Sequence, residues 1–382
     1  MFSFRRSTLA LVIAVSAVLL AVGVAACGSS SSSSSSSSSA STNAATAKSA
    51  ADFGGMDALV SAAKAEGTLN VIALPPDWAN YGEMISAFTA KYGIKINSAQ
   101  PDGSSQDEIN AAKQLKGTDR APDVFDVGGS VALANLSVFA PYMVAAWDQI
   151  PANLKDPTGL WVSDYTGYMS IGYNAAKVPT PTTMNDLLKA AYKGTVALNG
   201  NPTQASAGFN GVVMAAVANG GGADNLAPGV DFFSKLKKAG NLLPVDPTPA
   251  TIASGQTPVV IDWDYNNVAQ TAALKGKMDW KVVVPANEVV AAYYNQAINV
   301  DAPHPAAARL WQEFVFSPEG QNIWLKGAAR PVLLDQMVKD GTVDQAALAA
   351  LPKAVGTPVT LTQAQLDAGQ KYLLANWTKA VQ

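Results

Sequence analysis

The sequence predicts an α/β protein organised in two lobes, each with a sheet flanked by helices. Short runs of β-forming residues alternate with stretches of helical spacing, and this alternation implies helices packed on the faces of a sheet. Residues 52–382 are long for one compact hydrophobic core and suit two. At 48% hydrophobic and 14% charged residues, the composition is ordinary for a soluble globular protein.

The first elements follow from periodicity and from turn residues. Met56, Leu59, Val60 and Ala63 have the spacing of one helix face, and Gly67 ends that helix. Apolar, β-forming runs between turn signals indicate buried strands. The pattern predicts helices at residues 56–66, 80–92 and 105–115, and strands at residues 69–74, 94–98 and 123–127.

The alternation continues in a second unit and then returns. Residues 167–174 are typical of a strand that leaves the first sheet, and residues 280–284 and 293–300 of strands that lead back. We expect further elements of the second unit at residues 184–191, 195–198, 208–218, 230–239 and 257–263, and C-terminal helices at residues 305–316, 318–325 and 363–378.

The N-terminus has the pattern of an export signal. Arg5 and Arg6 precede an uncharged run, residues 8–26, rich in Ala, Val and Leu. A membrane-spanning helix is the alternative for a run of this length. Small residues followed by Cys27 and Gly28 resemble the cleavage site of a lipoprotein signal, and Cys27 is the only cysteine. We therefore expect a signal peptide at residues 1–26 and a lipid on Cys27.

The segment after Cys27 is predicted to be a flexible spacer. Residues 29–39 are an unbroken serine run, and small polar residues cannot bury enough apolar surface to fold. Residues 27–51 would then link the folded domain to lipid at the outer face of the bacterial cytoplasmic membrane, which two acyl chains hold far better than one. Lipidation consumes the thiol, so we expect neither disulfide nor thiol chemistry.

The composition also disfavours several classes of function. The formal net charge is −3 and no basic patch suggests a nucleic-acid partner. A His-based catalytic triad could use only His304, the single histidine, which lies between Pro303 and Pro305. Zinc-protease and nucleophile-elbow motifs are absent from the sequence, although a converging pair of carboxylates, as in a hydrolase, stays open.

Three segments carry a resemblance to a known family. Residues 62–69 (AAKAEGTL), 302–308 (APHPAAA) and 314–321 (FVFSPEGQ) resemble type 2 extracellular solute-binding proteins, which include iron(III), polyamine and phosphonate binders. The resemblance implies a periplasmic-binding-protein-like fold with mixed sheets and a cleft between the lobes. It also implies two crossover strands at a hinge, matched by residues 167–174 and 293–300. Lobe one would hold residues 52–166 and 300–382, and lobe two residues 167–299.

That resemblance implies a function without catalysis. The protein would capture a small-molecule ligand and deliver it to an ABC permease and its ATPase. We expect a monomer without cofactor or metal ion. A sensor that presents the ligand to a membrane receptor, or a lipid-anchored hydrolase, are the alternatives from other classes.

Candidate ligand-binding residues lie in loops that follow strands, where open α/β sheets bind ligands. Each of these loops could equally serve as a turn or a helix cap. Gly129 would let backbone approach a ligand, and the loop before residue 208 could hold an anion on free N–H groups. The first three loops contribute Asp77, Trp78, Gly129, Ser130, Gln204 and Ser206.

The most distinctive candidate loop is residues 262–265, where two acids and two aromatic residues follow a strand. Trp263, Asp264 and Tyr265 would pair with and pack on an organic cation, since aromatic faces attract cations by about 0.5–2 kcal/mol. Iron(III) binders are expected to carry adjacent tyrosines here, and only Tyr265 fits. We expect the change Asp264→Ala to weaken binding about tenfold or more.

Further candidates lie on the returning crossover strand. Alternation directs one of Tyr293 and Tyr294 to the cleft and the other inward, and the sequence does not say which. Structural roles are favoured for Glu288, His304 and Arg330. Taken together, the loops favour a polyamine-like organic cation as ligand, followed by a phosphonate-type anion and then iron(III).

Overall fold

The computed structural model of the chain describes residues 43–381. The expected signal peptide, Cys27 and the serine run lie outside these described residues. The described strands form a two-stranded parallel sheet and an eight-stranded sheet, and the long strand β5 (Val162–Asn174) of the larger sheet joins two groups of elements. Short 3-10 helices lie at Ala44–Thr46, Ala50–Phe53, Leu136–Val138, Trp147–Gln149, Ala152–Leu154, Met184–Leu188 and Ala190–Tyr192.

The first group surrounds strand β3 (Val124–Gly128), and we call it the β3 side. Strands β1 (Thr68–Ile72) and β2 (Lys95–Ala99) are parallel, whereas β3 is antiparallel to β9 (Ala291–Asn299). The other elements of this group are α1 (Met56–Glu66), α2 (Tyr81–Tyr92), α3 (Ser105–Gln114), α4 (Gly129–Ala134), β4 (Phe139–Ala140), α9 (Pro305–Val315), α10 (Pro318–Lys326), β10 (Arg330–Pro331), α11 (Leu334–Asp340) and α12 (Gln345–Ala350).

Two of the sequence segments that suggested the family meet on the β3 side. The Glu66 carboxylate at the end of α1 accepts hydrogen bonds from Ala306 N–H (3.0 Å) and Ala307 N–H (2.8 Å) at the start of α9. A carboxylate at a helix N-terminus satisfies N–H groups that have no partner within the helix. In this chain the two segments therefore lie where α1 docks on α9.

The second group surrounds strand β7 (Val259–Trp263), and we call it the β7 side. Strand β6 (Val196–Leu198) is parallel to β7, and β7 is antiparallel to β5. The buried helix α5 (Ser206–Ala218) packs on α6 (Ala227–Lys238). The remaining elements are α7 (Pro249–Ala253), α8 (Asp264–Ala273) and β8 (Trp280–Val283).

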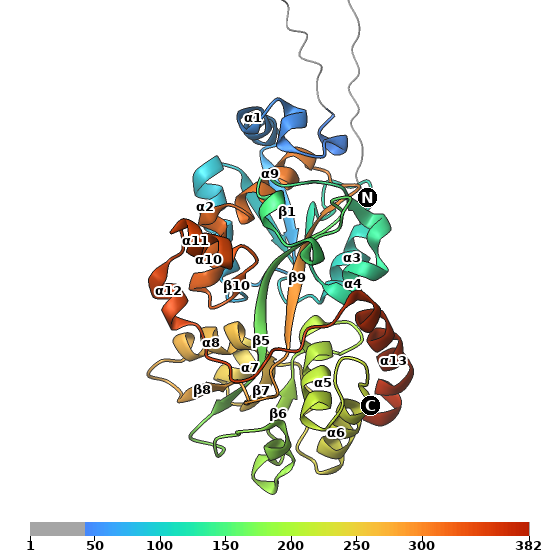
Figure 1. Cartoon of the computed structure of the whole chain (residues 1–382), viewed down its shortest axis with the longest axis vertical. Helices are drawn as coiled ribbons and strands as arrows, with labels where there is room; N and C mark the ends of the chain where they lie inside the picture. Colours follow the sequence, from blue (N-terminus) through green and yellow to red (C-terminus); the bar gives the residue numbers. More distant parts are fainter. Residues whose placement is uncertain (1–42, 382) are drawn as a thin grey trace, which may run out of the picture. The chain divides into compact units, whose positions relative to one another are not determined.

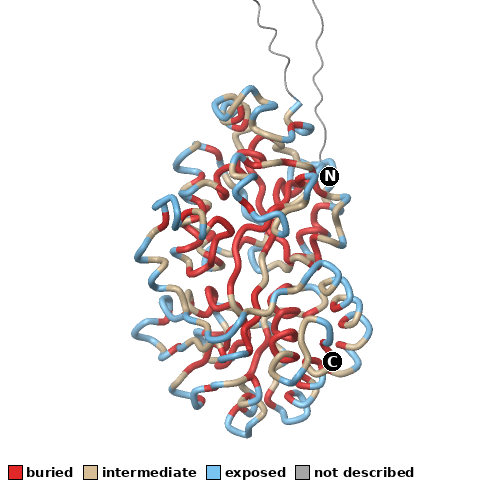
Figure 2. The backbone as a smooth tube through the Cα atoms, viewed as in Figure 1, coloured by how far each residue is buried: buried red, intermediate tan, exposed pale blue. Residues whose placement is uncertain are grey.

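Strands β5 and β9 run between the two sides (Figure 1). Residues 162–168 of β5 pair with β9 and β10, and residues 169–174 pair with β7 and β8. Nearly every residue of β5 is buried, and the strand is drawn red along most of its length in Figure 2. The prediction of a strand at residues 167–174 is correct at its end, but β5 begins at Val162.

The last helix, α13 (Gln363–Val381), packs mainly against the β7 side. The Trp377 ring lies 5.4 Å from Phe233 of α6, and Gln370 donates a 2.7 Å hydrogen bond to the Thr203 carbonyl. Leu366 also lies against Gly129 at the start of α4. Helix α13 therefore contacts both sides, although no feature of the sequence separates it from residues 300–362.

Most predicted helices and strands occur within a few residues of their expected positions, but helix α8 was not expected. The segment after β7 reads as a loop because Asn266 and Asn267 are poor helix formers. Residues 184–191 were expected to be one element, and instead two 3-10 helices end at Leu188 and Tyr192.

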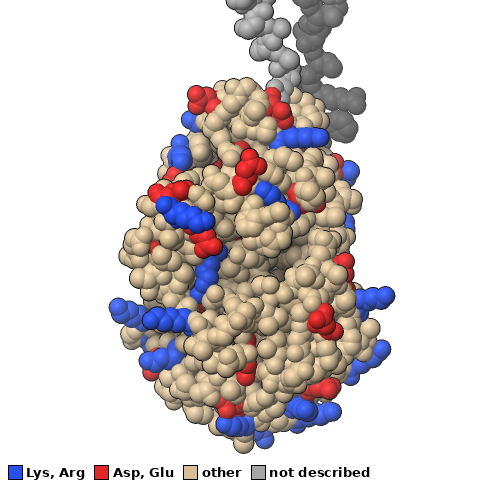
Figure 3. All heavy atoms as spheres, in the orientation of Figure 1, with Lys and Arg blue, Asp and Glu red and all other residues tan. Residues whose placement is uncertain are grey.

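Acidic and basic side chains are interspersed on the face drawn in Figure 3. Within residues 43–381, no helix has both the length and the apolar character needed to cross a membrane.

Candidate ligand-binding site

A cavity of about 290 Å³ lies between the β3 side and the β7 side, and we call it the cleft. Its size is near the lower end of small-molecule sites, roughly 300–1,000 Å³. Its walls are built from loops after β1, β2 and β6, from the middle of β3, from the C-terminal end of β7, and from the first turns of α3, α5 and α8. This is where ligands bind in open α/β sheets.

The cleft is lined by acids and amides. No Lys, Arg or His is found among the described residues that line it. A wall of this composition attracts cations and repels anions. The lining acids are Asp77, Asp102, Asp107, Glu108, Asp126, Asp246 and Asp262, and the lining amides are Asn199, Asn201, Gln204, Asn266, Asn267 and Gln270.

On the β7 side, Asp262 is held by neutral groups. Its carboxylate accepts a 2.7 Å hydrogen bond from Trp263 N–H and a 3.0 Å bond from the Asn266 amide. Burial raises the pKa of Asp262 to about 6, and the hydrogen bonds oppose that shift. Because Asn266 directs its NH₂ group to a carboxylate, its Oδ1 must face elsewhere, and that oxygen has no hydrogen-bond partner among the described residues.

On the β3 side, Asp126 lies in a cluster of buried acids. Its Oδ2 accepts 2.8 Å hydrogen bonds from the hydroxyls of Tyr81 and Tyr165, and its N–H donates to Glu108 over 3.0 Å. Burial raises the pKa of Asp126 to about 6. Burial and the Asp126 charge raise the pKa of both Glu108 and Asp164.

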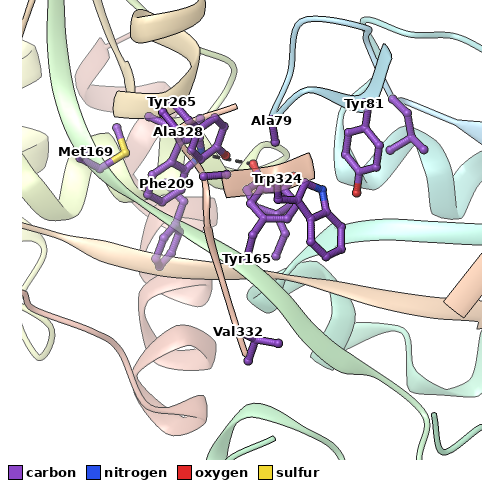
Figure 4. Close-up of a cluster of buried hydrophobic side chains, with 14 of the residues drawn as sticks. Ala79, Tyr81, Tyr165, Met169, Phe209, Tyr265, Trp324, Ala328 and Val332 are labelled. Carbon is purple, nitrogen blue, oxygen red and sulfur yellow. Dashed lines mark hydrogen bonds between the residues drawn. The ribbon is translucent and has the colours of Figure 1, made fainter. Parts of the chain in front are cut away.

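Aromatic rings connect the cleft to the buried core. Trp78 lines the cleft, stands edge-on to Tyr265 and Tyr294, and donates a 2.8 Å hydrogen bond from its indole N–H to the Tyr165 hydroxyl. Tyr165 stacks on Tyr294 with ring centroids 5.7 Å apart. Figure 4 shows Tyr81, Tyr165 and Trp324 gathered beside strand β5, with Tyr265 farther along the cluster. Trp78 and Tyr294 therefore line the polar cleft, and the rings of Tyr165 and Tyr265 pack behind them.

Besides the ring contact between Trp78 and Tyr265, the two sides approach each other at two further places in or beside the cleft. Gln270 of α8 donates a 3.1 Å hydrogen bond to Asp77, in the loop after β1. Gly128, at the end of β3, is so close to Ser206 that a Cβ atom built on Gly128 would lie 2.4 Å from the Ser206 Cβ. The expected glycine loop therefore allows the approach of the opposite side, and only glycine fits at Gly128 in this arrangement.

Five of the predicted ligand-binding residues line the cleft. The structure brings together Asp77, Trp78, Gln204, Ser206 and Tyr294. Tyr294 is thus the member of the tyrosine pair that faces the cleft. Tyr293, its neighbour on β9, does not line the cleft, because successive residues of a strand point to opposite faces.

The structure does not place Trp263, Asp264 and Tyr265 in the cleft, which corrects the prediction for this loop. All three are buried. Helix α8 begins at Asp264, and its first residues pack on Gly167 of β5, where a Cβ would meet both Tyr265 and Asp264. The prediction assumed that residues 262–265 form a loop whose side chains all face the cleft. In a helix, successive side chains point in different directions.

Asp264 is part of a buried ion pair instead. Its Oδ2 lies 2.8 Å from Arg330 Nη1, and its Oδ1 accepts a 2.9 Å hydrogen bond from Tyr168 N–H. Arg330 also donates to the Pro352 carbonyl and lies over the Tyr168 ring at 4.0 Å. The structural role expected for Arg330 agrees with these contacts, and the expected effect of Asp264→Ala on binding has to be replaced by an effect on stability.

Gly129 and Ser130 also lie outside the cleft. Helix α4 begins at Gly129, which is covered by Leu366, and Ser130 faces a shallow surface groove beside α13. The structural roles favoured for two further residues agree with their contacts. Glu288 accepts a 2.8 Å hydrogen bond from Met184 N–H, and His304 Nδ1 lies 2.9 Å from the Asp123 carboxylate.

Sequence reasoning missed Asp126 and Glu108. Asp126 is the middle residue of a buried strand, and Glu108 lies on the buried face of α3, so neither follows a strand as the other candidates do. The sequence did contain one signal for Asp126, namely an acid within an apolar strand. Burying an acid costs free energy unless the group is hydrogen-bonded or paired. Among described residues, no cluster of three or more His, Cys, Asp or Glu side chains is arranged to hold a metal ion.

The comparison with known families identifies the chain. Residues 123–354 match the family described as bacterial extracellular solute-binding protein. The chain belongs to this family. It is therefore an extracytoplasmic protein that binds a small solute and carries out no reaction, as the sequence predicted, and the family implies association with an ABC transporter.

Solved structures show the same periplasmic-binding-protein fold. AgtB from A. tumefaciens R10, in complex with agropinic acid, matches with a TM-score of 0.64 and 16% identity, over 82% of this chain and 98% of AgtB. Iron-bound HitA from Pseudomonas aeruginosa has a TM-score of 0.58 and 19% identity, over 82% and 99%. A putative spermidine/putrescine ABC transporter protein from Listeria monocytogenes has 0.55 and 14%, over 81% and 98%. No curated protein sequence matches this chain.

Proposed function

We propose that this solute-binding protein captures a polyamine-like organic cation in the cleft and delivers it to an ABC permease. The main support for this proposal is the composition of the cleft wall, which contains seven acids and, among the described residues, no basic side chain. A cation bound there would offset charges that now repel one another. An anion would have to enter the same wall against that repulsion.

The unpartnered polar atoms of the cleft support the same ligand. Asn266 Oδ1 is an acceptor on a residue that is only 9% exposed, and it has no donor among the described residues. An ammonium group has three N–H donors and no acceptor, so it complements acceptors of this kind. Trp78 and Tyr294 would pack on the methylene groups between the charges of such a ligand.

The lobes and the hinge form part of this proposal. We assign the β3 side to lobe one, residues 52–166 and 300–362, and the β7 side to lobe two, residues 167–299. Helix α13 is added to lobe two, because its ring contact with Phe233 and its hydrogen bond to Thr203 tie it there. Strands β5 and β9 would act as the crossover strands, since β5 pairs with strands of both sides and β9 pairs with β5, and a few of their residues would absorb the closing motion.

The membrane anchor is a separate part of the proposal and rests on the sequence. A signal peptide at residues 1–26 would be removed, Cys27 would carry lipid, and residues 27–51 would tether the lobes outside the cytoplasmic membrane. The change Cys27→Ala should abolish labelling by a lipid precursor and release the protein from the membrane fraction. Labelling equal to that of the unchanged chain would contradict the anchor.

A thermal-shift screen tests the ligand class. Putrescine and spermidine should raise the melting temperature, because a ligand at a hundred times its Kd stabilises the folded state by about 2.7 kcal/mol. Phosphonates, ferric citrate, sugars and amino acids should have no effect. A shift with phosphonates alone would contradict the cation proposal, as would a ferric citrate shift without an amine shift.

One observation favours a phosphonate-type anion as the second candidate. Helix α5 begins at Ser206 in the cleft wall, and its N-cap residue Ala205 provides no side-chain cap. Free N–H groups at a helix start can bind an anion. This candidate is weaker because Asp262 and Asp126 line the same cleft. A thermal shift with a phosphonate and with neither amine would favour this candidate.

A further inference from the structure

The buried acids of the β3 side are arranged in an unusual way around Asp126. Oδ1 of Asp126 accepts no hydrogen bond from an N–H or hydroxyl group of the described residues. The Asp164 carboxyl lies close by, because Gln296 donates 2.9 Å hydrogen bonds both to Asp164 and to the Tyr81 hydroxyl, which in turn donates to Asp126. Two carboxyl groups can hydrogen-bond to each other only when one of them carries a proton. Two buried acids this close together, with no cation paired to either among the described residues, favour a state in which they share one proton.

The two members of this pair have different surroundings. Asp126 is part of the cleft wall, whereas Asp164 is fully buried on β5 and does not line the cleft. Asp164 accepts a 2.6 Å hydrogen bond from Tyr165 N–H and a 2.9 Å bond from the Gln296 amide. Asp126 is thus the member that a ligand can reach, and Asp164 influences the charge of Asp126 from the buried side.

We propose that Asp126 and Asp164 share one proton in the wall of the cleft, so that the cleft holds its cation at neutral pH and releases it in acid. This inference rests on the proposed cation ligand. At neutral pH the pair carries one negative charge and attracts the ammonium group. In acid both carboxyls are protonated, the charge disappears, and Asp126 becomes a poor partner for a cation.

The groups that face Asp126 leave no other source of positive charge. None of the described Lys, Arg or His residues forms an ion pair with Asp126, Asp164 or Glu108. Neutral hydrogen-bond donors are the partners of the charged form of the cluster, and a bound cation would supply the positive charge that it lacks. The titratable groups around Asp126 are Tyr81 from α2, Glu108 from α3, Asp164 and Tyr165 from β5, Tyr265 from α8 and Tyr294 from β9.

The pH range of the effect follows from the groups in the cleft wall. Burial raises the pKa of Asp126 to about 6, and the pKa of Asp262 on the opposite wall also lies at about 6. A cation that binds only the charged form of one carboxylate loses about tenfold in affinity per pH unit below that pKa. Between pH 7.5 and pH 5 we expect about a tenfold loss from each carboxylate.

Calorimetric titration of the full chain with putrescine and with spermidine, at pH 7.5, 6 and 5, tests the proposal. The unchanged protein should lose about a hundredfold in affinity between pH 7.5 and pH 5. At pH 6, titrations in buffers of different ionisation enthalpy should reveal proton release on binding. The change Asp126→Asn should remove about tenfold of the pH effect and lower the number of protons released.

The change Asp164→Asn separates proton sharing from a structural role. Asparagine donates to Asp126 permanently, so binding at pH 7.5 should persist and the loss of affinity should move to lower pH. Asp231→Asn, on the exposed face of α6, is the matched control and should leave the pH profile unchanged. Circular dichroism spectra would identify a variant that fails to fold, and Asp126→Asn then decides alone.

The outcomes distinguish this inference from the proposed function. If neither amine binds at any pH, the proposed cation ligand fails and this inference fails with it. If an amine binds equally well at pH 7.5 and pH 5, or binds without proton release at pH 6, the proposed function stands and the shared proton is refuted. A profile that Asp126→Asn leaves unchanged would also refute it.

Discussion

Asp262 and Asp264 are separated by one residue, but their carboxylates have opposite electrostatic surroundings. Asp262 ends strand β7 in the cleft wall, where its hydrogen-bond partners are a backbone N–H and amides. Asp264 begins helix α8, is fully buried, and pairs with Arg330 at 2.8 Å. The first carboxylate lacks a cation among the described residues, and the second has one.

The difference suggests how to separate ligand-binding acids from structural acids in this protein. An acid with a built-in cation has its charge satisfied before any ligand arrives, so it contributes to the fold. An acid held by neutral donors in a cavity wall leaves charge for a ligand to satisfy. Asp126 and Asp262 are of the second kind, and Asp264 and Asp123 are of the first kind.

The largest expected effect comes from removing one member of the Asp264–Arg330 ion pair. The change Asp264→Ala leaves Arg330 charged, buried and without its partner, which typically costs about 3–5 kcal/mol. The free energy of unfolding, measured by urea denaturation, should fall by that order. The double variant Asp264→Ala with Arg330→Leu should recover part of the loss, because no unpaired charge remains. Equal stability of Asp264→Ala and the unchanged chain would contradict the comparison.

The change Asp262→Asn should affect binding rather than stability. Putrescine affinity at pH 7.5 should fall at least about tenfold, or about 1.4 kcal/mol. Asp262 binds its proton more tightly in the folded state, so its contribution to stability falls as pH rises from about 4 to 6 and stays low above that. The ligand-free variant should therefore be at least as stable as the unchanged chain at pH 7.5. Asp231→Asn serves as control, and a variant with normal affinity would remove Asp262 from the site.

The contact between the two sides should have a smaller effect on binding. In Gly128→Ala the new Cβ would meet the Ser206 Cβ at 2.4 Å, so the sides could not approach as closely. We expect a several-fold loss of ligand affinity, measured by calorimetry, with little change in the folded structure. Adding Ser206→Gly removes the opposing atom and should restore part of the affinity. Failure of this rescue, with the single variant folded and impaired, would contradict a steric cause.

The smallest expected effect concerns His304. The hydrogen bond to Asp123 raises the pKa of His304, so its charged form is favoured in the folded state. Its contribution to stability is present below the unfolded pKa of about 6.5 and is lost as pH rises through the higher folded pKa. Urea denaturation from pH 5.5 to pH 8.5 should show this decline in the unchanged chain, and His304→Asn should flatten it. A decline of equal size in both would contradict the assignment.

The fold was largely predictable from the sequence because its strands and helices have clear periodicity. The positions of α1, β3, β7 and α9 follow from apolar spacing and from glycine or proline at their ends. Helix α8 was not predictable in the same way. The low helix propensity of two asparagines in the first turns of α8 argues against a helix in the sequence. Packing against Gly167 of β5 outweighs that low propensity in the structure.

The candidate site was predictable only in part. Loops that follow strands could be found in the sequence, and Asp77, Trp78, Gln204 and Ser206 were identified in that way. Asp126 could not be found by that rule, because its role depends on Tyr81 and Tyr165, which come from distant parts of the chain. Burial and partner choice are tertiary properties, and local spacing does not contain them.

The most direct test of the cation-binding cleft compares a charged ligand with a neutral ligand of the same chain length. Putrescine and 1,4-butanediol have the same four-carbon chain, with ammonium groups in the first and neutral hydroxyls in the second. Calorimetry at pH 7.5 should detect binding of putrescine and none of butanediol. Equal affinity for both, or binding of butanediol alone, would contradict the central role of the acids in the cleft wall.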